Sequence, residues 1–196
     1  MHLSMSLPYY LQNNFIYRIG LIFVLIFGFS LEAADIKENK LKLIRGKVKF
    51  ISKAPKLEFA GIGKEIQGYV DLKNKRIHFI LELNSFKTGI KLRDEHLREN
   101  YLETEKYPTA EFSGLIKTYD PKTGIAEAAG KLKLHGEEKD NFLIKGKVEK
   151  TDGTYRLTSN FSVLLKDFKI EIPRVVFLEL SNEIKIETEF ILAGEP

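Results

Sequence analysis

The chain has 196 residues, of which 43% are hydrophobic and 30% are charged, a composition typical of one ordinary folded domain with a sizeable core. Its net charge of +4 is mild. Its lysines are spread along the chain instead of forming a dense basic stripe with stacking aromatics, so we expect no nucleic-acid surface. The absence of cysteine excludes disulfides, thiolate chemistry and a lipid-modified cysteine.

Residues 1–33 have the pattern of a secretory signal peptide. The segment from Ile19 to Phe29 is an uninterrupted run of apolar residues and glycine, and small residues follow it. This run is about half as long as the ~20 residues that a bilayer span needs. We expect cleavage near Ala33 or Ala34, a mature domain of residues 34–196 without a membrane span, and a periplasmic or secreted location. An uncleaved membrane anchor is the alternative.

The first half of the mature chain contains three alternating runs, at residues 44–50, 66–72 and 77–83. Alternation of apolar and polar residues with period two indicates β-strands with one buried face. In the first run the buried face is expected to hold every second residue, namely Ile44, Gly46, Val48 and Phe50. The three runs therefore predict consecutive antiparallel strands.

A different pattern occupies residues 88–112, where charged and aromatic residues gather and the alternation stops. Four residues give this segment an apolar side: Leu92, Leu97, Tyr101 and Leu102. Because Pro108 disfavours helical geometry at Tyr107, a helix here should end before that residue. The segment is predicted to be a short helix lying across a barrel mouth, followed by a returning strand.

Alternating runs then continue to the end of the chain, separated by strong turn signals such as Asp-Pro-Lys-Thr-Gly and Asp-Gly. About eight or nine strands joined by short hairpins are expected. Antiparallel sheets with a single buried face close as a sandwich or as an up-and-down barrel, and sequential hairpins favour the barrel. The predicted fold is therefore all-β, an antiparallel up-and-down barrel of about eight strands with one short helical insertion.

Glycines fall in the apolar phase of four predicted strands, at Gly46, Gly68, Gly114 and Gly146. Inward glycines either mark bends where a barrel turns its corners or leave space for a ligand. An eight-stranded barrel is wide enough to be just filled or to hold one small ligand. The candidate cavity-lining residues are Gly46, Val48, Phe50, Gly68, Val70, Phe79, Leu81, Phe112, Gly114, Ile144, Gly146 and Phe161.

Three ionisable residues of the insertion, Arg93, Asp94 and His96, are the candidate contacts to a polar ligand head group. A helix with internal ion pairs, such as Asp94 with Arg98, and an acid–base site are the two other interpretations. No serine-centred motif or carboxylate pair accompanies them, as catalysis would need. The histidines of the mature chain lack ligand spacing, so no metal site is predicted.

Several motifs resemble the YceI-like family. They are RDEHL at 93–97, YLETEKYP at 101–108, EFSG at 111–114 and GKLKLHG at 130–136. Members are secreted bacterial lipocalin-like barrels that bind polyisoprenoid lipids, so the resemblance implies that fold for residues 34–196. It also implies that the barrel encloses an extended lipid chain. We expect a hydrophobic lipid partner, of quinone or prenyl phosphate type, that is bound or transported without covalent attachment or catalysis.

Two rival interpretations and one question of assembly stay open. The protein could be an enzyme that acts on an isoprenoid-like substrate through Arg93, Asp94 and His96. It could instead be a fully packed structural or stress-related barrel. A homodimer is compatible with the sequence.

Overall fold

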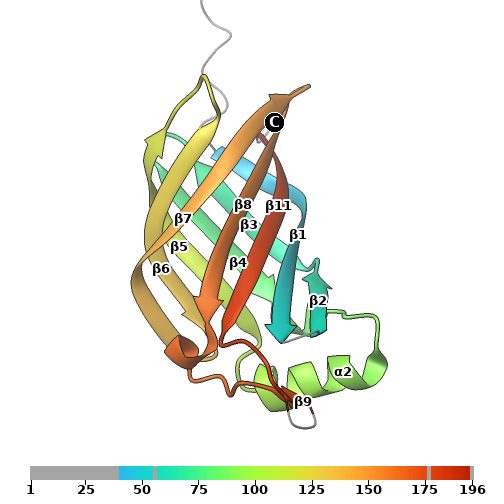
Figure 1. The fold of residues 1–196 in the computed structure, drawn as a ribbon. Coiled ribbons are helices and arrows are strands. Elements are labelled where there is room, and N and C mark those ends of the chain that lie inside the picture. Colours follow the sequence, from blue (N-terminus) through green and yellow to red (C-terminus); the bar gives the residue numbers. More distant parts are fainter. Residues whose placement is uncertain (1–39, 55–56, 176–177, 195–196) are drawn as a thin grey trace, which may run out of the picture. The chain divides into compact units, whose positions relative to one another are not determined.

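The protein is described here by a computed structural model that covers residues 40–54, 57–175 and 178–194 (Figure 1). Contacts divide the chain into two units, Met1–Ile36 and Lys37–Pro196, and every described residue belongs to the second. The predicted signal peptide and its cleavage point lie outside the described residues.

The second unit is built mainly from antiparallel strands connected in sequence. The strands of its large sheet are β1 (Lys40–Ala54), β2 (Leu57–Gly63), β3 (Ile66–Asp71), β4 (Arg76–Glu82), β5 (Thr109–Tyr119), β6 (Ile125–Leu134), β7 (Glu137–Thr151), β8 (Thr154–Leu164) and β11 (Glu183–Gly194). The short elements are η1 (Leu83–Ser85), α2 (Lys91–His96), the π-helical turn η2 (Leu97–Tyr101), η3 (Leu165–Phe168), β9 (Arg174–Val175) and β10 (Leu178–Glu179).

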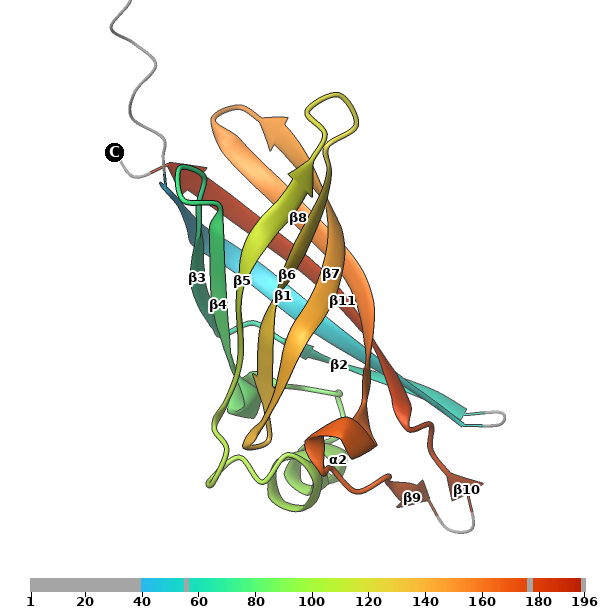
Figure 2. The ribbon, with the colours of Figure 1, turned by 90° about the vertical axis from the view of Figure 1, so that its left-hand side faces the viewer.

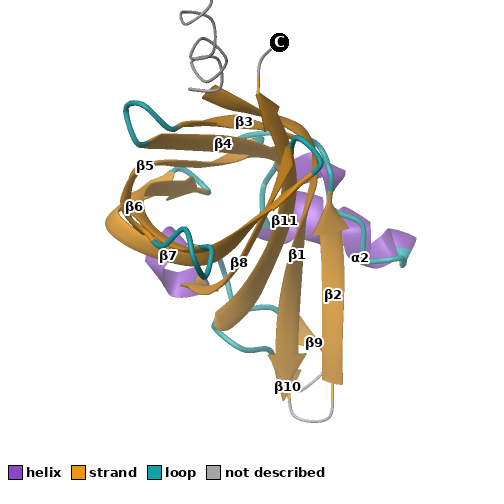
Figure 3. Ribbon diagram, turned by 90° about the horizontal axis from the view of Figure 1, so that it is seen from above, coloured by secondary structure: helices purple, strands orange, loops and turns teal. Residues whose placement is uncertain are grey.

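The strand order β11-β8-β7-β6-β5-β4-β3-β1-β2, with a further pairing of β11 to β1, closes the sheet into a barrel. Eight of its nine strands form the ring, and β2 pairs with the end of β1. Figure 3 shows this ring from above. The predicted all-β antiparallel barrel with one short helical insertion is confirmed.

Strand β1 closes the barrel, because it pairs with a neighbouring strand along each of its two edges. One of its edges pairs with β11, from Leu41 opposite Gly194 onward. Its other edge pairs first with β3, and then, from Val48 opposite Gly63, with β2. The first strand of the barrel therefore holds three partners, and no other described strand has more.

The prediction is wrong for one residue of β1 that was expected to face inward: Ile44 is 57% exposed. The register with β11 shifts between Leu43 and Arg45, which leaves Ile44 as an extra residue. An extra residue in one strand reverses the phase of the alternation, because successive side chains point to opposite faces. Leu41 and Leu43 therefore pack inward before the bulge, and Val48 packs inward after it.

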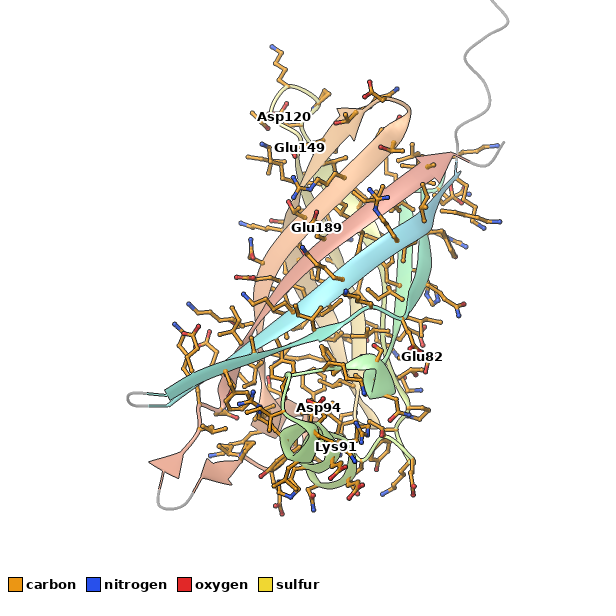
Figure 4. The ribbon with its side chains drawn as sticks, turned by 90° about the vertical axis from the view of Figure 1, so that its right-hand side faces the viewer. Glu82, Lys91, Asp94, Asp120, Glu149 and Glu189 are labelled. Carbon is orange, nitrogen blue, oxygen red and sulfur yellow. The ribbon has the colours of Figure 1, made fainter. Side chains whose placement is uncertain are left out.

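The outer face of the barrel carries cross-strand ion pairs. Lys47 Nζ lies 2.8 Å from Glu189 Oε2, and Arg156 Nη2 lies 3.0 Å from Glu189 Oε1 (Figure 4). Exposed pairs of this kind contribute about 0–1 kcal/mol each, because water screens them and the side chains lose freedom. They keep the outer surface polar, and the folding free energy comes mainly from the apolar interior.

The helical insertion lies across one end of the barrel, and the β5–β6 and β7–β8 turns lie at the opposite end (Figures 1 and 2). We call residues 88–108 the flap. Its helix α2 passes directly into η2, where the Leu102 amide donates to the Leu97 carbonyl at 2.9 Å. As predicted, helical structure ends before Tyr107. Within the described ranges no helix has the length and apolar character needed to cross a membrane.

Candidate ligand-binding cavity

The interior of the barrel contains a cavity of about 620 Å³. Small-molecule sites usually measure ~300–1,000 Å³ and have mostly apolar walls with a few placed polar groups. Nine of the predicted lining residues form part of this wall: Val48, Phe50, Val70, Phe79, Leu81, Phe112, Ile144, Gly146 and Phe161. The strand pattern and the closure of the ring thus bring these side chains together around one space.

The other three predicted lining residues, Gly46, Gly68 and Gly114, are not part of the cavity wall. A Cβ atom at Gly46 would lie 2.7 Å from Cδ1 of Phe190, and one at Gly68 would lie 2.3 Å from Cδ1 of Phe79. These phenyl rings pack against each other with centroids 4.5 Å apart. The glycines at 46 and 68 therefore admit aromatic rings close to the backbone, and the rings occupy the space.

The flap forms part of the wall at one end of the cavity. The four apolar residues predicted for its inner side, Leu92, Leu97, Tyr101 and Leu102, all line the cavity. Residues after η3, including Ile170 and Leu180, line it as well. The end wall is therefore formed by two segments that are distant in sequence.

Arg93 lies in this end wall. Its Nη2 atom donates to the Thr88 carbonyl at 3.0 Å, and its guanidinium carbon lies 4.9 Å from the centroid of the Phe59 ring. A guanidinium over an aromatic face is attracted by the negative potential of the ring. These two contacts fix the side chain against the inner surface of the cavity.

Asp94 is buried but is not part of the cavity wall. Its Oδ1 atom accepts hydrogen bonds from the Thr88 amide at 2.7 Å and from the Thr88 hydroxyl at 2.5 Å. Burial alone would raise the pKa of Asp94, but the bonds from Thr88, with the charges of Lys87 and Arg98, hold that pKa below its usual value. Asp94 is thus a charged anchor for the start of the flap.

His96 lines the cavity at an exposed position, and its side chain makes no hydrogen bond to another described residue. Of the three head-group candidates, Arg93 and His96 reach the wall, and Asp94 turns to Thr88. Among the described ion pairs the α2 helix contributes Lys91 with Glu95, at 3.9 Å, and not the predicted Asp94–Arg98 pair (Figure 4). The three side chains therefore do not converge on one point.

Sequence reasoning missed a buried contact at His135. Its Nε2 lies 2.7 Å from Glu103 Oε2, its Nδ1 lies 3.0 Å from the Phe168 carbonyl oxygen, and the Tyr107 ring packs against it. The two ring nitrogens thus face two oxygen atoms that come from different segments of the chain. We call this contact the His135 tether, and it fastens the flap to η3.

Hydroxyl groups also line the cavity, and these too were missed. Ser159 Oγ and Thr188 Oγ1 lie 2.7 Å apart and satisfy each other across β8 and β11. Ser52 is only 2% exposed and follows Val48 and Phe50 in the inward phase of β1. A polar residue in an inward phase was the signal that could have identified all three. No group of three metal-ligating side chains occurs in the described part of the chain.

Comparisons with known proteins bear on the family and the fold of this chain. The family model for the YceI-like domain matches residues 41–192. Among curated proteins none matches the chain.

Solved structures share the fold at low sequence identity. A polyisoprenoid-binding domain from Saccharophagus degradans superposes with a TM-score of 0.65 at 16% identity, covering 81% of this chain and 100% of that one. BcnA from Burkholderia cenocepacia superposes with a TM-score of 0.64 at 17% identity, covering 74% of this chain and 95% of that one. The YceI protein of Campylobacter jejuni superposes with a TM-score of 0.53 at 17% identity, covering 86% of this chain and 92% of that one. At such identities the likeness establishes the fold alone.

Proposed function

We propose, from the premise that this chain belongs to the YceI-like family, that its barrel binds a polyisoprenoid lipid without covalent chemistry. The apolar cavity of about 620 Å³ under the flap is the observation that carries the proposal. A structural neighbour, from Saccharophagus degradans, is a polyisoprenoid-binding domain, which supports the same ligand class here. We also propose that the protein is exported and carries its lipid outside the cytoplasm, as the apolar N-terminal run indicates.

The energetics favour recognition of the hydrocarbon chain. Burying one methylene contributes about 0.8 kcal/mol, so one five-carbon isoprene unit contributes roughly 4 kcal/mol as an upper limit. A few units inside the cavity therefore outweigh any single polar contact. A hydrogen bond to a charged group adds about 1.5–3 kcal/mol. Affinity should thus rise with chain length until the cavity is full.

Lipid extraction and a chain-length series test this function together. The protein is purified from its native host, its mass is measured under native conditions, and bound lipid is identified after organic extraction. The emptied protein is then titrated with isoprenoids of one head group and increasing length. We expect a copurifying lipid, and a dissociation constant that falls by about tenfold or more for each added unit at the short end.

Two outcomes of the same experiment would contradict the proposed function. An empty protein that also takes up none of the added isoprenoids would support the packed structural barrel. Equal affinity for short and long chains would contradict recognition of the hydrocarbon. A linear alkyl chain with the same number of carbons is the matched control for shape, because it has similar apolar area but lacks the methyl branches.

A further inference from the structure

In the described part of the chain two side-chain atoms are buried without a hydrogen-bond partner: Ser52 Oγ and Arg93 Nε. Both residues belong to the wall of the cavity. Buried polar groups in folded proteins nearly always have partners, and an unpaired group carries the full cost of its desolvation. Two such atoms in one cavity therefore indicate that a ligand supplies what the protein does not.

The two residues flank the same aromatic side chain. Ser52 is directly opposite Phe59 in the β1–β2 register, and the Arg93 guanidinium carbon lies 4.9 Å from the Phe59 ring centroid. Phe59 itself lines the cavity. The two unpaired atoms thus belong to one region, where the end of β1, β2 and the flap meet (Figure 1).

Their chemistry defines what can bind. The Arg93 Nε–H is only a donor, and the Ser52 hydroxyl can donate as well. A ligand atom that completes both must be an acceptor, such as a carbonyl, carboxylate or phosphate oxygen. An apolar chain end or a ligand that offers only donors would leave the Arg93 atom unsatisfied.

The positive charge of Arg93 restricts the class of ligand head group further. The Arg93 guanidinium is permanently charged, and its hydrogen-bonded partner is the neutral Thr88 carbonyl. Arg93 forms no ion pair with a described carboxylate, and the adjacent Asp94 accepts its hydrogen bonds from Thr88. A half-buried cation beside an apolar wall is stabilised by an anion, because opposite charges attract more strongly near a protein surface than in bulk water.

We infer that the Ser52 hydroxyl and the Arg93 guanidinium bind an anionic head group, a phosphate or carboxylate, at the flap end of the cavity. The hydrocarbon chain then extends away from the flap into the barrel. This inference rests on the proposed function and deepens it, because it assigns the direction of the lipid and the class of its polar end. Ser52 is the residue that no sequence motif had singled out.

The test compares four probes: farnesyl phosphate, farnesol, a neutral quinone with a side chain of equal length, and inorganic phosphate. For the unaltered protein we expect farnesyl phosphate to bind about tenfold to a hundredfold more tightly than farnesol or the quinone. Inorganic phosphate should not bind measurably, because it lacks the apolar chain. Its binding with comparable affinity would mean a simple anion site and would overturn the lipid assignment.

Two variants and one control locate the effect. Arg93→Gln should reduce the preference for farnesyl phosphate over farnesol to about threefold or less, because the phosphate loses a charged partner and the alcohol loses at most a neutral hydrogen bond. Ser52→Ala should reduce the preference by about threefold to tenfold and should raise the melting temperature of the empty protein, since it removes an unpaired buried hydroxyl. Ser85→Ala is the control: its hydroxyl already donates to the Glu82 carbonyl at 2.6 Å and is not part of the cavity wall. This variant should keep the preference for farnesyl phosphate and should melt at a lower temperature than the unaltered protein.

The outcomes separate this inference from the proposed function. If every isoprenoid binds but phosphate, alcohol and quinone bind equally, the head-group site is refuted and lipid binding stands. The same holds if Ser52→Ala leaves the preference intact and does not stabilise the empty protein. If none of the isoprenoids binds, the proposed function itself is refuted.

Discussion

A single carboxylate fastens the start of the flap. Asp94 accepts two hydrogen bonds from Thr88, and its pKa is lowered below the usual value of 3.8 despite burial, which acts in the opposite direction. A carboxyl group with a lower pKa in the folded state than in the unfolded state stabilises the folded state above the unfolded pKa. That stabilisation is lost as the pH falls from about 3.8 through the lower folded value.

We therefore predict that Asp94→Asn lowers the free energy of unfolding by about 1–3 kcal/mol at pH 7. Its difference from the unaltered protein should shrink as the pH falls below about 4. Urea unfolding at a series of pH values measures this.

Asp120→Asn is the control for this prediction. Asp120 accepts a hydroxyl bond from Thr123 and an amide bond from Lys122, and these bonds lower its pKa too. It lies in an exposed turn (Figure 4), so its substitution should change stability less. Equal effects of the two substitutions, or a difference at position 94 that does not shrink as the pH falls below about 4, would contradict the anchoring role.

At the scale of elements, the flap packs on the barrel through Leu97, Tyr101 and Leu102, and a small set of hydrogen bonds fixes its position. The His135 tether fixes its C-terminal part, and Thr104 Oγ1 donates to Asn84 Oδ1 at 2.6 Å. Its N-terminal side is joined to β2 by paired bonds between Ile62 and Lys87. Elements with so few attachments open locally, at a free energy below that of global unfolding.

We predict that Glu103→Gln accelerates amide hydrogen exchange in residues 97–107 by about threefold to thirtyfold, since it removes the charge from the tether. The amides of β5 and β6, which are paired on both sides, should keep their rates. Glu105→Gln, at an exposed neighbouring position, is the control and should change neither. A uniform acceleration across the barrel would show that the flap does not open on its own.

At the scale of the whole barrel domain, the cavity links lipid binding to stability. A ligand that binds only the folded state at 100 times its dissociation constant adds about 2.7 kcal/mol. For a domain of this size, that corresponds to an increase in melting temperature of roughly 5–10 °C. We predict such a shift when an isoprenoid is added to the emptied protein, measured by calorimetry.

A variant with a filled cavity controls for nonspecific effects of the lipid. Ala128 is buried and lines the cavity, so Ala128→Phe should occupy part of its volume. The folded variant should show a shift less than half as large as the unaltered protein. A full shift in that variant would mean that the lipid stabilises the protein from outside the cavity.

The sequence predicted the strands and their inward faces because burial alternates with the same period as the side chains. Val48, Phe50 and Phe79 were placed from this pattern alone, and all three line the cavity. Ile44 was misplaced because a bulge depends on the register of a distant strand, which the local pattern does not contain. The space expected above Gly46 was misjudged for a related reason: the ring that fills it belongs to Phe190.

The candidate site was less predictable than the fold. Arg93 and His96 were singled out by their position in the flap, and both reach the cavity wall. The partners of His135 come from Glu103 and the Phe168 carbonyl, which only the folded chain brings together. Ser52 was visible in the alternation as a polar residue in an inward phase, but its lack of a partner can be seen only in three dimensions.

The closure of the ring by β1 and β11 also determines when the barrel can form. Leu41 pairs with Gly194, so the seam joins the two extremes of the described chain. Pairing across such a separation has a large entropic cost of loop closure and forms slowly. Neighbouring hairpins can assemble while synthesis continues, but the ring stays open until its last strand arrives. The cavity is thus the final product of folding, and a chain truncated before β11 would have strands but no enclosed interior.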